Sequence, residues 1–156
     1  SCPCSPSDMT DLEYLRCPLY EAQLAASEKE IPVGAVLVYQ DTLIAASHNR
    51  RENENDPTAH AEVRVLQEAA RKLDRWRLTD CTLYVTIEPC PMCAGAILNA
   101  RISRLVYGAD DPKAGAVRSL FHILNSSALN HRVSVRSGLL EKECRLLMQS
   151  FFTKRR

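Results

Sequence analysis

The sequence predicts an α/β fold of three layers, with a central sheet of about five strands between helices on both faces. Short apolar, β-branched runs alternate along the chain with longer segments whose apolar residues recur at helical spacing. This alternation is typical of α/β proteins, because each helix buries its apolar stripe against a sheet. With 156 residues, of which 46% are hydrophobic and 25% charged, the chain is long enough to bury the core of such a fold.

Local patterns place the individual elements. Strands are expected at residues 34–39, 42–47, 83–87, 104–108 and 133–137, and helices after residue 10, at 61–73, 91–100, 119–124 and 140–152. Thr10-Asp11-Leu12-Glu13 has the pattern of a capping box and starts the first helix. Pro18 should kink or restart that helix, because proline lacks the amide proton of the helical ladder. The Gln40-Asp41 pair predicts a tight hairpin between the first two strands.

The chain is expected to form one domain at residues 11–156, after a flexible tail at residues 1–10 whose Cys2 and Cys4 have no assigned role. It contains no run of about 18 uncharged apolar residues, so no membrane-spanning helix is expected. Seven cysteines, two of them in the motif described below, argue against a disulfide scaffold and favour a reducing compartment. We therefore expect a cytoplasmic protein, or an organellar one if a targeting segment has been removed. Cys17, Cys81 and Cys144 have apolar neighbours and are expected to be buried.

The net charge of +1 hides an asymmetry between the two parts of the chain. Residues 1–93 carry 9 basic and 15 acidic side chains, whereas residues 94–156 carry 11 basic and 4 acidic ones. The second part therefore offers a surface that attracts phosphate groups. A solvated helix face followed by a basic tail is the alternative interpretation.

Two short motifs at residues 57–63 and 88–93 contain the residues that point to chemistry. His60, Cys90 and Cys93 are good zinc ligands, and Cys90 stands at a helix start with Pro91 at the first helical position. Three protein ligands leave the fourth tetrahedral position open, which is typical of catalytic zinc. Glu62 is close enough to reach a water at that position and to act as a general acid and base. A structural zinc would need a fourth ligand, and Cys81, His48, His122 and His131 lack convincing spacing.

Several segments together resemble the bacterial-type tRNA-specific adenosine deaminases, which belong to the cytidine deaminase-like zinc deaminases. They are residues 31–38, Asn49, residues 56–62, residues 88–96 and Asn130-His131-Arg132. The resemblance covers nearly all of the chain after residue 10. It implies a cytidine deaminase-like fold, a homodimer, and hydrolytic conversion of adenosine to inosine at the wobble position (34) of tRNA anticodons.

The resemblance also implies roles for individual residues. His60, Cys90 and Cys93 would bind one zinc ion per subunit, and Glu62 would carry protons. Asn49 would hydrogen-bond the flipped base, and Val33 would line its pocket. Contacts with the anticodon nucleotides are implied for Asp110, Asp111 and Lys113, and contacts with RNA phosphates for Lys154, Arg155 and Arg156. Asn130-His131-Arg132 marks the family without an assigned role, and a structural turn is an equal alternative.

Two other functions fit parts of the sequence. A free-base guanine deaminase shares the motifs at residues 56–62 and 88–93; residues 31–33, residues 130–132 and the basic C-terminal helix favour the tRNA enzyme. A non-catalytic zinc subunit that only presents RNA to a partner is the second alternative. The intact Glu62 argues against it, because a structural subunit does not need this carboxylate.

Overall fold

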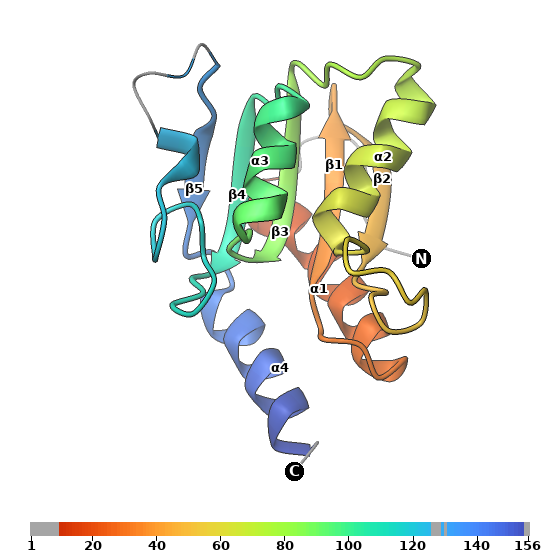
Figure 1. Cartoon of the computed structure of the whole chain (residues 1–156), viewed down its shortest axis with the longest axis vertical. Helices are drawn as coiled ribbons and strands as arrows, with labels where there is room; N and C mark the ends of the chain where they lie inside the picture. Colours follow the sequence, from red (N-terminus) through yellow and green to blue (C-terminus); the bar gives the residue numbers. More distant parts are fainter. Residues whose placement is uncertain (1–9, 126–128, 130, 155–156) are drawn as a thin grey trace.

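The computed structural model contains a five-stranded mixed sheet with helices on both faces (Figure 1). It describes residues 10–125, 129 and 131–154. The strand order is β2-β1-β3-β4-β5; β1 is antiparallel to both of its neighbours, whereas β3, β4 and β5 are parallel. The strands are β1 (Gly34–Tyr39), β2 (Thr42–His48), β3 (Cys81–Ile87), β4 (Arg104–Ala109) and β5 (Ser134–Ser137). The helices are α1 (Asp11–Ser27), α2 (Ala61–Leu73), α3 (Pro91–Asn99), the 3-10 turn η1 (Ile123–Asn125) and α4 (Glu141–Lys154). The predicted three-layer α/β/α fold is confirmed.

The two faces of the sheet bury different side chains of the same strands. In β1, Ala35 and Leu37 belong to the large core that α2 and α3 cover. Val36 and Val38 point the other way, into a smaller core with Leu15 of α1. Because successive side chains of a strand point to opposite faces, a strand covered on both sides is apolar throughout. This explains why the sequence of β1 shows no polar alternation.

Most predicted elements are present with small shifts in their bounds. Gln40 and Asp41 have φ angles of 49° and 59°, as a tight hairpin turn requires, and they join β1 to β2 as predicted. The helix predicted at residues 119–124 is wrong, because only the three-residue turn η1 forms there. The amides of residues 117–121 are used instead by Glu88 and by the carbonyl of Gly115.

A restart of the first helix at Pro18, one of the two predicted outcomes, is also wrong, since α1 runs without a break from Asp11 to Ser27. An internal proline costs about 3 kcal/mol in an isolated helix, but packing can outweigh that cost. Pro18 is buried against the start of β1. A Cβ atom on Gly34 would lie only 2.0 Å from the carbonyl oxygen of Pro18, so glycine permits this close approach. Thr10 caps the helix by accepting a hydrogen bond from the amide of Glu13 at 3.3 Å, as predicted.

Asp11, in the first turn of α1, joins this helix to three strands. Its carboxylate accepts hydrogen bonds from the hydroxyl of Tyr84 at 2.7 Å, from Arg104 at 2.7 Å and from Arg136 at 2.9 Å. The contact with Arg104 has the largest effect and holds the pKa of Asp11 well below its usual value. These strands therefore hold α1 in place through one ionised group.

The remaining expectations concern the tail, the cysteines and the membrane. Residues 1–9 of the predicted tail lie outside the described residues. Cys17, Cys81 and Cys144 are buried as expected. Cys81 and Cys144 are free, whereas Cys17 is disulfide-bonded, so the cysteines give the expected reducing compartment no support. Among the described helices, none is long and apolar enough to cross a membrane.

Candidate active site

The starts of α2 and α3 lie at the same end of the sheet (Figure 1), and the predicted metal ligands are located there. His60 occupies the N-cap position of α2 and Cys90 that of α3, where Pro91 follows at the first helical position; neither side chain makes a capping hydrogen bond. Cys93 lies one turn further along α3 and is fully buried. These positions agree with the start signals in the sequence, because proline is favoured at the first position of a helix.

The three donor atoms have the spacing of a metal site. The Nδ1 atom of His60 lies 3.7 Å from the Sγ atom of Cys90 and 3.6 Å from that of Cys93. A tetrahedral zinc ion with ordinary bond lengths would separate such nitrogen and sulfur atoms by about 3.6 Å. All three atoms lie within 4.8 Å of one another, and no other His, Cys, Asp or Glu of the described residues joins the group. The ligand set therefore fits zinc with one position open.

The pKa values of the Cys90 and Cys93 thiols are shifted in opposite directions. Hydrogen bonds with Cys93 and with His60 lower the pKa of Cys90 to about 4, although burial opposes this shift. The contact with Cys90, together with burial, raises the pKa of Cys93. These contacts favour the thiolate form of Cys90, and the thiolate is the form of cysteine that binds metals.

Glu62 lies in the first turn of α2, two residues after His60, and its side chain is buried with 4% exposure. Burial raises the pKa of Glu62 to about 7. Its Oε1 atom has no hydrogen-bond partner among the described atoms. Such an oxygen is costly to bury unless a bound molecule satisfies it. The carboxylate borders the same cleft as His60 and Cys90, where it can accept or deliver a proton.

The cleft in front of these residues has a volume of about 990 Å³. Its floor is formed by the ends of β3 and β4 and by the starts of α2 and α3. Helix α4, which extends beyond the sheet in Figure 1, supplies one wall. The side chains that line the cleft outside the floor are Ile31, Val33, Asn49 and Arg51, then Asp110, Asp111, Pro112, Lys113 and Ala114, and from α4 Arg145, Met148, Gln149, Phe152 and Thr153.

Val33 and Asn49, predicted to meet the base, both line this cleft. The side-chain nitrogen of Asn49 donates to the backbone carbonyl of Ile31 at 3.3 Å, and its side-chain oxygen accepts from the backbone amide of Arg51 at 3.1 Å. These contacts fix the orientation of the side chain and use one of its two N–H bonds. Asn49 can therefore donate one hydrogen bond to a bound molecule.

Asp110, Asp111 and Lys113 also reach the cleft, on the loop that follows β4. The carboxylate of Asp110 accepts from the hydroxyl of Tyr107 at 2.7 Å. The carboxylate of Asp111 accepts from the amide of Lys113 at 3.0 Å and thereby shapes its own loop. The Lys113 side chain is exposed at the cleft. The contacts of the two acidic side chains are thus with β4 and with their own loop, and their predicted roles toward the substrate stay predictions.

The predicted basic end of the chain is only partly described. Lys154 is exposed at the last residue of α4 and does not line the cleft, and Arg155 and Arg156 lie outside the described residues. The apolar stripe of α4 is expected to pack in the core, and Met148 does pack against the small core cluster that contains Cys144, while it also lines the cleft. Of that stripe only Cys144 is fully buried, packed against Gly108. No sequence pattern distinguishes a helix face that covers a cleft from one that covers a core.

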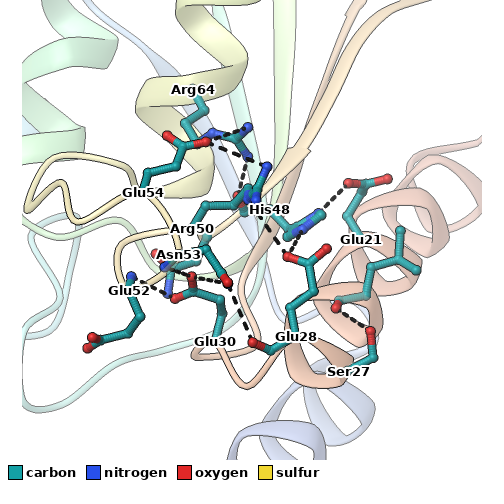
Figure 2. A network of polar contacts seen from close by, with 12 residues as sticks. Glu21, Ser27, Glu28, Glu30, His48, Arg50, Glu52, Asn53, Glu54 and Arg64 are labelled. Carbon is teal, nitrogen blue, oxygen red and sulfur yellow. Dashed lines mark hydrogen bonds and ion pairs between the residues drawn. The ribbon is translucent and has the colours of Figure 1, made fainter.

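The loop between β2 and His60 is held by the network of polar contacts in Figure 2. Glu30 is fully buried and accepts hydrogen bonds from the amides of Glu52 at 3.0 Å and Asn53 at 2.7 Å. Although its burial favours the neutral form, these bonds lower the pKa of Glu30. Arg64 of α2 donates to the carbonyl of His48 at 2.7 Å and ties the helix to the strand end. The polar residues before His60 are therefore well anchored.

Two further residues outside the metal group have clear structural contacts. His131 has its Nε2 atom 2.6 Å from the carbonyl oxygen of Ile102, which supports the structural interpretation of this motif; Asn130 lies outside the described residues. Glu88, for which sequence reasoning gave no role, is buried beside the Cys90 motif. Burial opposes its ionisation, but hydrogen bonds from Ser119 and from loop amides lower the pKa of Glu88 to about 2.

Comparisons with known proteins identify the family of the chain. A family model of MafB19-like deaminases matches residues 9–156. The chain is 46% identical over 143 residues to the tRNA-specific adenosine deaminase of Bacillus subtilis (strain 168), a match that covers 92% of this chain and 89% of the relative.

Solved structures give the same result. One comes from studies of A-to-I editing by tRNA:A34 deaminases at the wobble position of transfer RNA; it is 46% identical, has a TM-score of 0.83, and the match covers 86% of this chain and 97% of that chain. The guanine deaminase of Bacillus subtilis is 39% identical with a TM-score of 0.63, over 65% of this chain and 66% of that one. Because the family model matches nearly the whole chain, the chain belongs to the MafB19-like deaminase family, alongside the bacterial tRNA-specific adenosine deaminases.

Proposed function

We propose that this protein is a zinc-dependent hydrolase that converts adenosine to inosine at the wobble position (34) of a tRNA anticodon. The observation that carries the proposal is the buried, unpartnered carboxylate oxygen of Glu62 beside three donor atoms at zinc spacing. Similarity to the tRNA-specific adenosine deaminases over nearly the whole chain supports this substrate. The reaction consumes one water and releases ammonia, so that a C–O bond replaces the C6–N bond of the base without any redox change.

The proposed chemistry divides between the metal and one side chain. His60, Cys90 and Cys93 would hold zinc, which acts as a Lewis acid and brings the pKa of a bound water to about 7. Glu62 would accept the proton of the attacking water and deliver it to the ring nitrogen next to the reacting carbon. It would then take the proton of the new hydroxyl group on C6 and pass it to the departing amine, which leaves as ammonia. Positioned proton transfer of this kind typically accounts for a rate factor of about 10² to 10⁴.

The walls of the cleft would orient the base and its neighbours. Asn49 would donate its remaining N–H to an acceptor on the purine, and Val33 would contact the ring. Asp110, Asp111 and Lys113 would meet the adjoining nucleotides, and Lys154, Arg155 and Arg156 would contact phosphates beyond the cleft. A flipped nucleotide needs such contacts, because leaving the base stack costs a few kcal/mol.

The test is inosine formation by the zinc-loaded protein on an anticodon stem-loop with adenosine at the wobble position. Glu62→Gln should lower kcat about 10²- to 10⁴-fold and retain zinc, measured by metal analysis. Glu68→Gln is the matched control, because Glu68 lies on the same helix and pairs with Lys72 at 2.9 Å on its outer surface. It should edit at the normal rate. Unchanged activity of Glu62→Gln would refute the role given to this carboxylate.

Free guanine and free adenosine, assayed beside the stem-loop, separate the proposal from the guanine deaminase alternative. Ammonia from guanine, with no inosine in the RNA, would replace the proposed substrate. The solved guanine deaminase named above matches less of the chain than the tRNA enzymes do. A non-catalytic zinc subunit would bind the stem-loop and metal but form no inosine.

We also infer a homodimer with one zinc ion per subunit. Apolar side chains are exposed at the start of α3 and in the segment between β4 and η1, where Met92, Leu120 and Phe121 are 36%, 52% and 50% exposed. A second copy would cover such side chains, which are unfavourable in water. Light scattering coupled to gel filtration measures the mass; a monomer at micromolar concentration would contradict the inference.

A further inference from the structure

Glu88 is a buried carboxylate that the proposed chemistry does not use. It follows β3 directly, stands two residues before Cys90, and is 3% exposed. Its oxygen atoms are not part of the group formed by the metal ligands. An ionised side chain with so little exposure needs several hydrogen-bond donors to compensate for its lost hydration.

The donors are four backbone amides and one hydroxyl, and all belong to the loop at residues 110–119. The Oε1 atom of Glu88 accepts from the amide of Asp111 at 3.0 Å and from the hydroxyl of Ser119. The Oε2 atom accepts from the amides of Val117, Arg118 and Ser119 at 3.0, 2.9 and 3.0 Å. Backbone groups at both ends of the loop therefore converge on one side chain.

The loop is shaped around this carboxylate. A Cβ atom on Gly115 would lie 2.3 Å from the carboxyl carbon of Glu88 and 2.4 to 2.5 Å from its oxygens, so only glycine fits there. The amide of Ala116 donates to the carbonyl of Pro89 at 2.9 Å, which adds a second connection to the same segment. The loop is thus attached to the two residues that precede Cys90.

The first half of this loop, residues 110–114, lines the cleft, as do Asn49 and Arg51. We propose that Glu88 is a positioning residue: it fixes the loop at 110–119 to the end of β3 and so holds the wall that contacts the nucleotides around the reacting base. The identity of those nucleotides rests on the proposed function. The link between Glu88 and the loop does not.

Glu88→Gln should remove some of these hydrogen bonds and keep others, because it keeps the size of the side chain and replaces one acceptor oxygen with an NH₂ group. If the remaining oxygen faces the three amides of residues 117–119, the NH₂ group faces the amide of Asp111. The NH₂ group and the amide of Asp111 are both donors and cannot hydrogen-bond to each other, whereas the hydroxyl of Ser119 can rotate and accept a hydrogen bond from the NH₂ group. The variant should therefore release the part of the loop that lines the cleft and keep the rest attached.

Hydrogen exchange on the zinc-loaded, full-length chain measures this release. In Glu88→Gln, peptides covering residues 110–116 should exchange about tenfold faster or more, with unchanged exchange in α2 and α3. Glu30→Gln is the matched control, because Glu30 is equally buried and anchors the amides of residues 52 and 53. It should accelerate exchange at residues 50–56 and leave 110–116 unchanged. Unchanged exchange at 110–116 in Glu88→Gln, or equal acceleration in α2 and α3, would overturn the proposal.

Kinetics on the anticodon stem-loop give the second readout. Glu88→Gln should raise KM more than it lowers kcat and should retain zinc, because the wall binds the substrate and the metal ligands are untouched. Faster loop exchange with an unchanged KM would overturn the positioning role. If the wild-type protein formed no inosine at all, the proposed function would fail, and the exchange measurement would still decide whether Glu88 holds the loop.

Discussion

Asp11→Asn should destabilise the fold while leaving the cleft intact, because it weakens the group that joins α1 to the sheet. The carboxylate of Asp11 is 11% exposed and pairs with the guanidinium groups of Arg104 and Arg136. Asparagine has nearly the same shape and keeps one acceptor oxygen. The substitution therefore removes the charge and one acceptor, and leaves an oxygen that can still accept from the hydroxyl of Tyr84.

The size of the effect follows from the exposure of each partner. A hydrogen bond to a charged group contributes about 1.5 to 3 kcal/mol when it is shielded from water. Arg104 is 35% exposed, so its two contacts with Asp11 retain much of that value, whereas Arg136 is 54% exposed and its pair contributes at most about 1 kcal/mol. We expect the free energy of unfolding at pH 7 to fall by about 2 to 3 kcal/mol.

The effect should depend on pH in a defined direction. The pKa of Asp11 is lower in the folded protein than in the unfolded chain, chiefly through its hydrogen bonds with Arg104. Ionised Asp11 therefore stabilises the fold fully when the pH is above the pKa of the unfolded chain, about 3.9. This contribution is lost as the pH falls through the pKa of Asp11 in the folded protein. The difference in stability between wild type and Asp11→Asn should therefore be constant from pH 5 to 7 and shrink below about pH 4.

Urea unfolding of the two zinc-loaded proteins, at pH 7 and at several lower pH values, measures this difference. Protonation of the metal ligands affects both proteins and cancels in the comparison. The folded variant should edit the stem-loop at the wild-type rate at pH 7. Equal stability at pH 7, or a difference that grows as the pH falls, would refute the reasoning.

Three further predictions concern the approach of α1 to the sheet, a histidine and the metal. Gly34→Ala should cost about 1 to 3 kcal/mol in urea unfolding, because the added Cβ atom would lie 2.0 Å from a backbone oxygen of α1; a neutral result would contradict this. His48 contacts Glu21 at 2.9 Å and Glu28 at 3.0 Å, and the hydrogen bond to Glu21 raises its pKa. His48→Gln should therefore destabilise the protein by about 1 kcal/mol below pH 6.5 and by less once the pH exceeds the folded pKa of His48, whereas a loss that grows toward high pH would be inconsistent. Removal of zinc by a chelator should lower the Tm of the wild type but not that of Cys93→Ser, since the variant lacks a ligand; equal shifts would argue against the assigned site.

The grouping of His60, Cys90 and Cys93 could be predicted from the sequence because its determinants are local. His60 and Cys90 lie at helix starts that short sequence motifs predict. Strands that run in the same direction place the starts of the helices that follow them at the same end of the sheet. Convergence of the ligands then follows from the alternation of strands and helices. The Nδ1 atom of His60 lies 3.7 Å from the Sγ atom of Cys90 and 3.6 Å from that of Cys93, which confirms that the three side chains converge.

The end of the loop at residues 110–119 could not be predicted in the same way. The apolar residues at 119–124 suggested a helix, but the amide of Ser119 donates to Glu88, and the amides of Leu120 and Phe121 donate to the carbonyl of Gly115. The side chains of a segment do not show where its backbone N–H groups point. Leu120 and Phe121 are therefore half exposed and not part of a helical stripe. Tertiary hydrogen bonds to one buried carboxylate outweigh the local preference here.

The choice between a free base and a base within RNA depends on the walls of the cleft and not on the metal. The metal motifs are shared with guanine deaminases, so they cannot distinguish the two substrates. A cleft of about 990 Å³ is at the upper end of the range for small-molecule pockets, and one purine base would leave most of it empty. The additional space is bounded by α4, which contributes Arg145, Gln149 and Phe152, that is, a cation, an amide and an aromatic ring. Proteins that bind single-stranded nucleic acids combine cationic and aromatic side chains in this way, since the charge attracts phosphates and the ring stacks on bases. The volume and the residues of α4 therefore favour a nucleotide with neighbours on both sides over a free base.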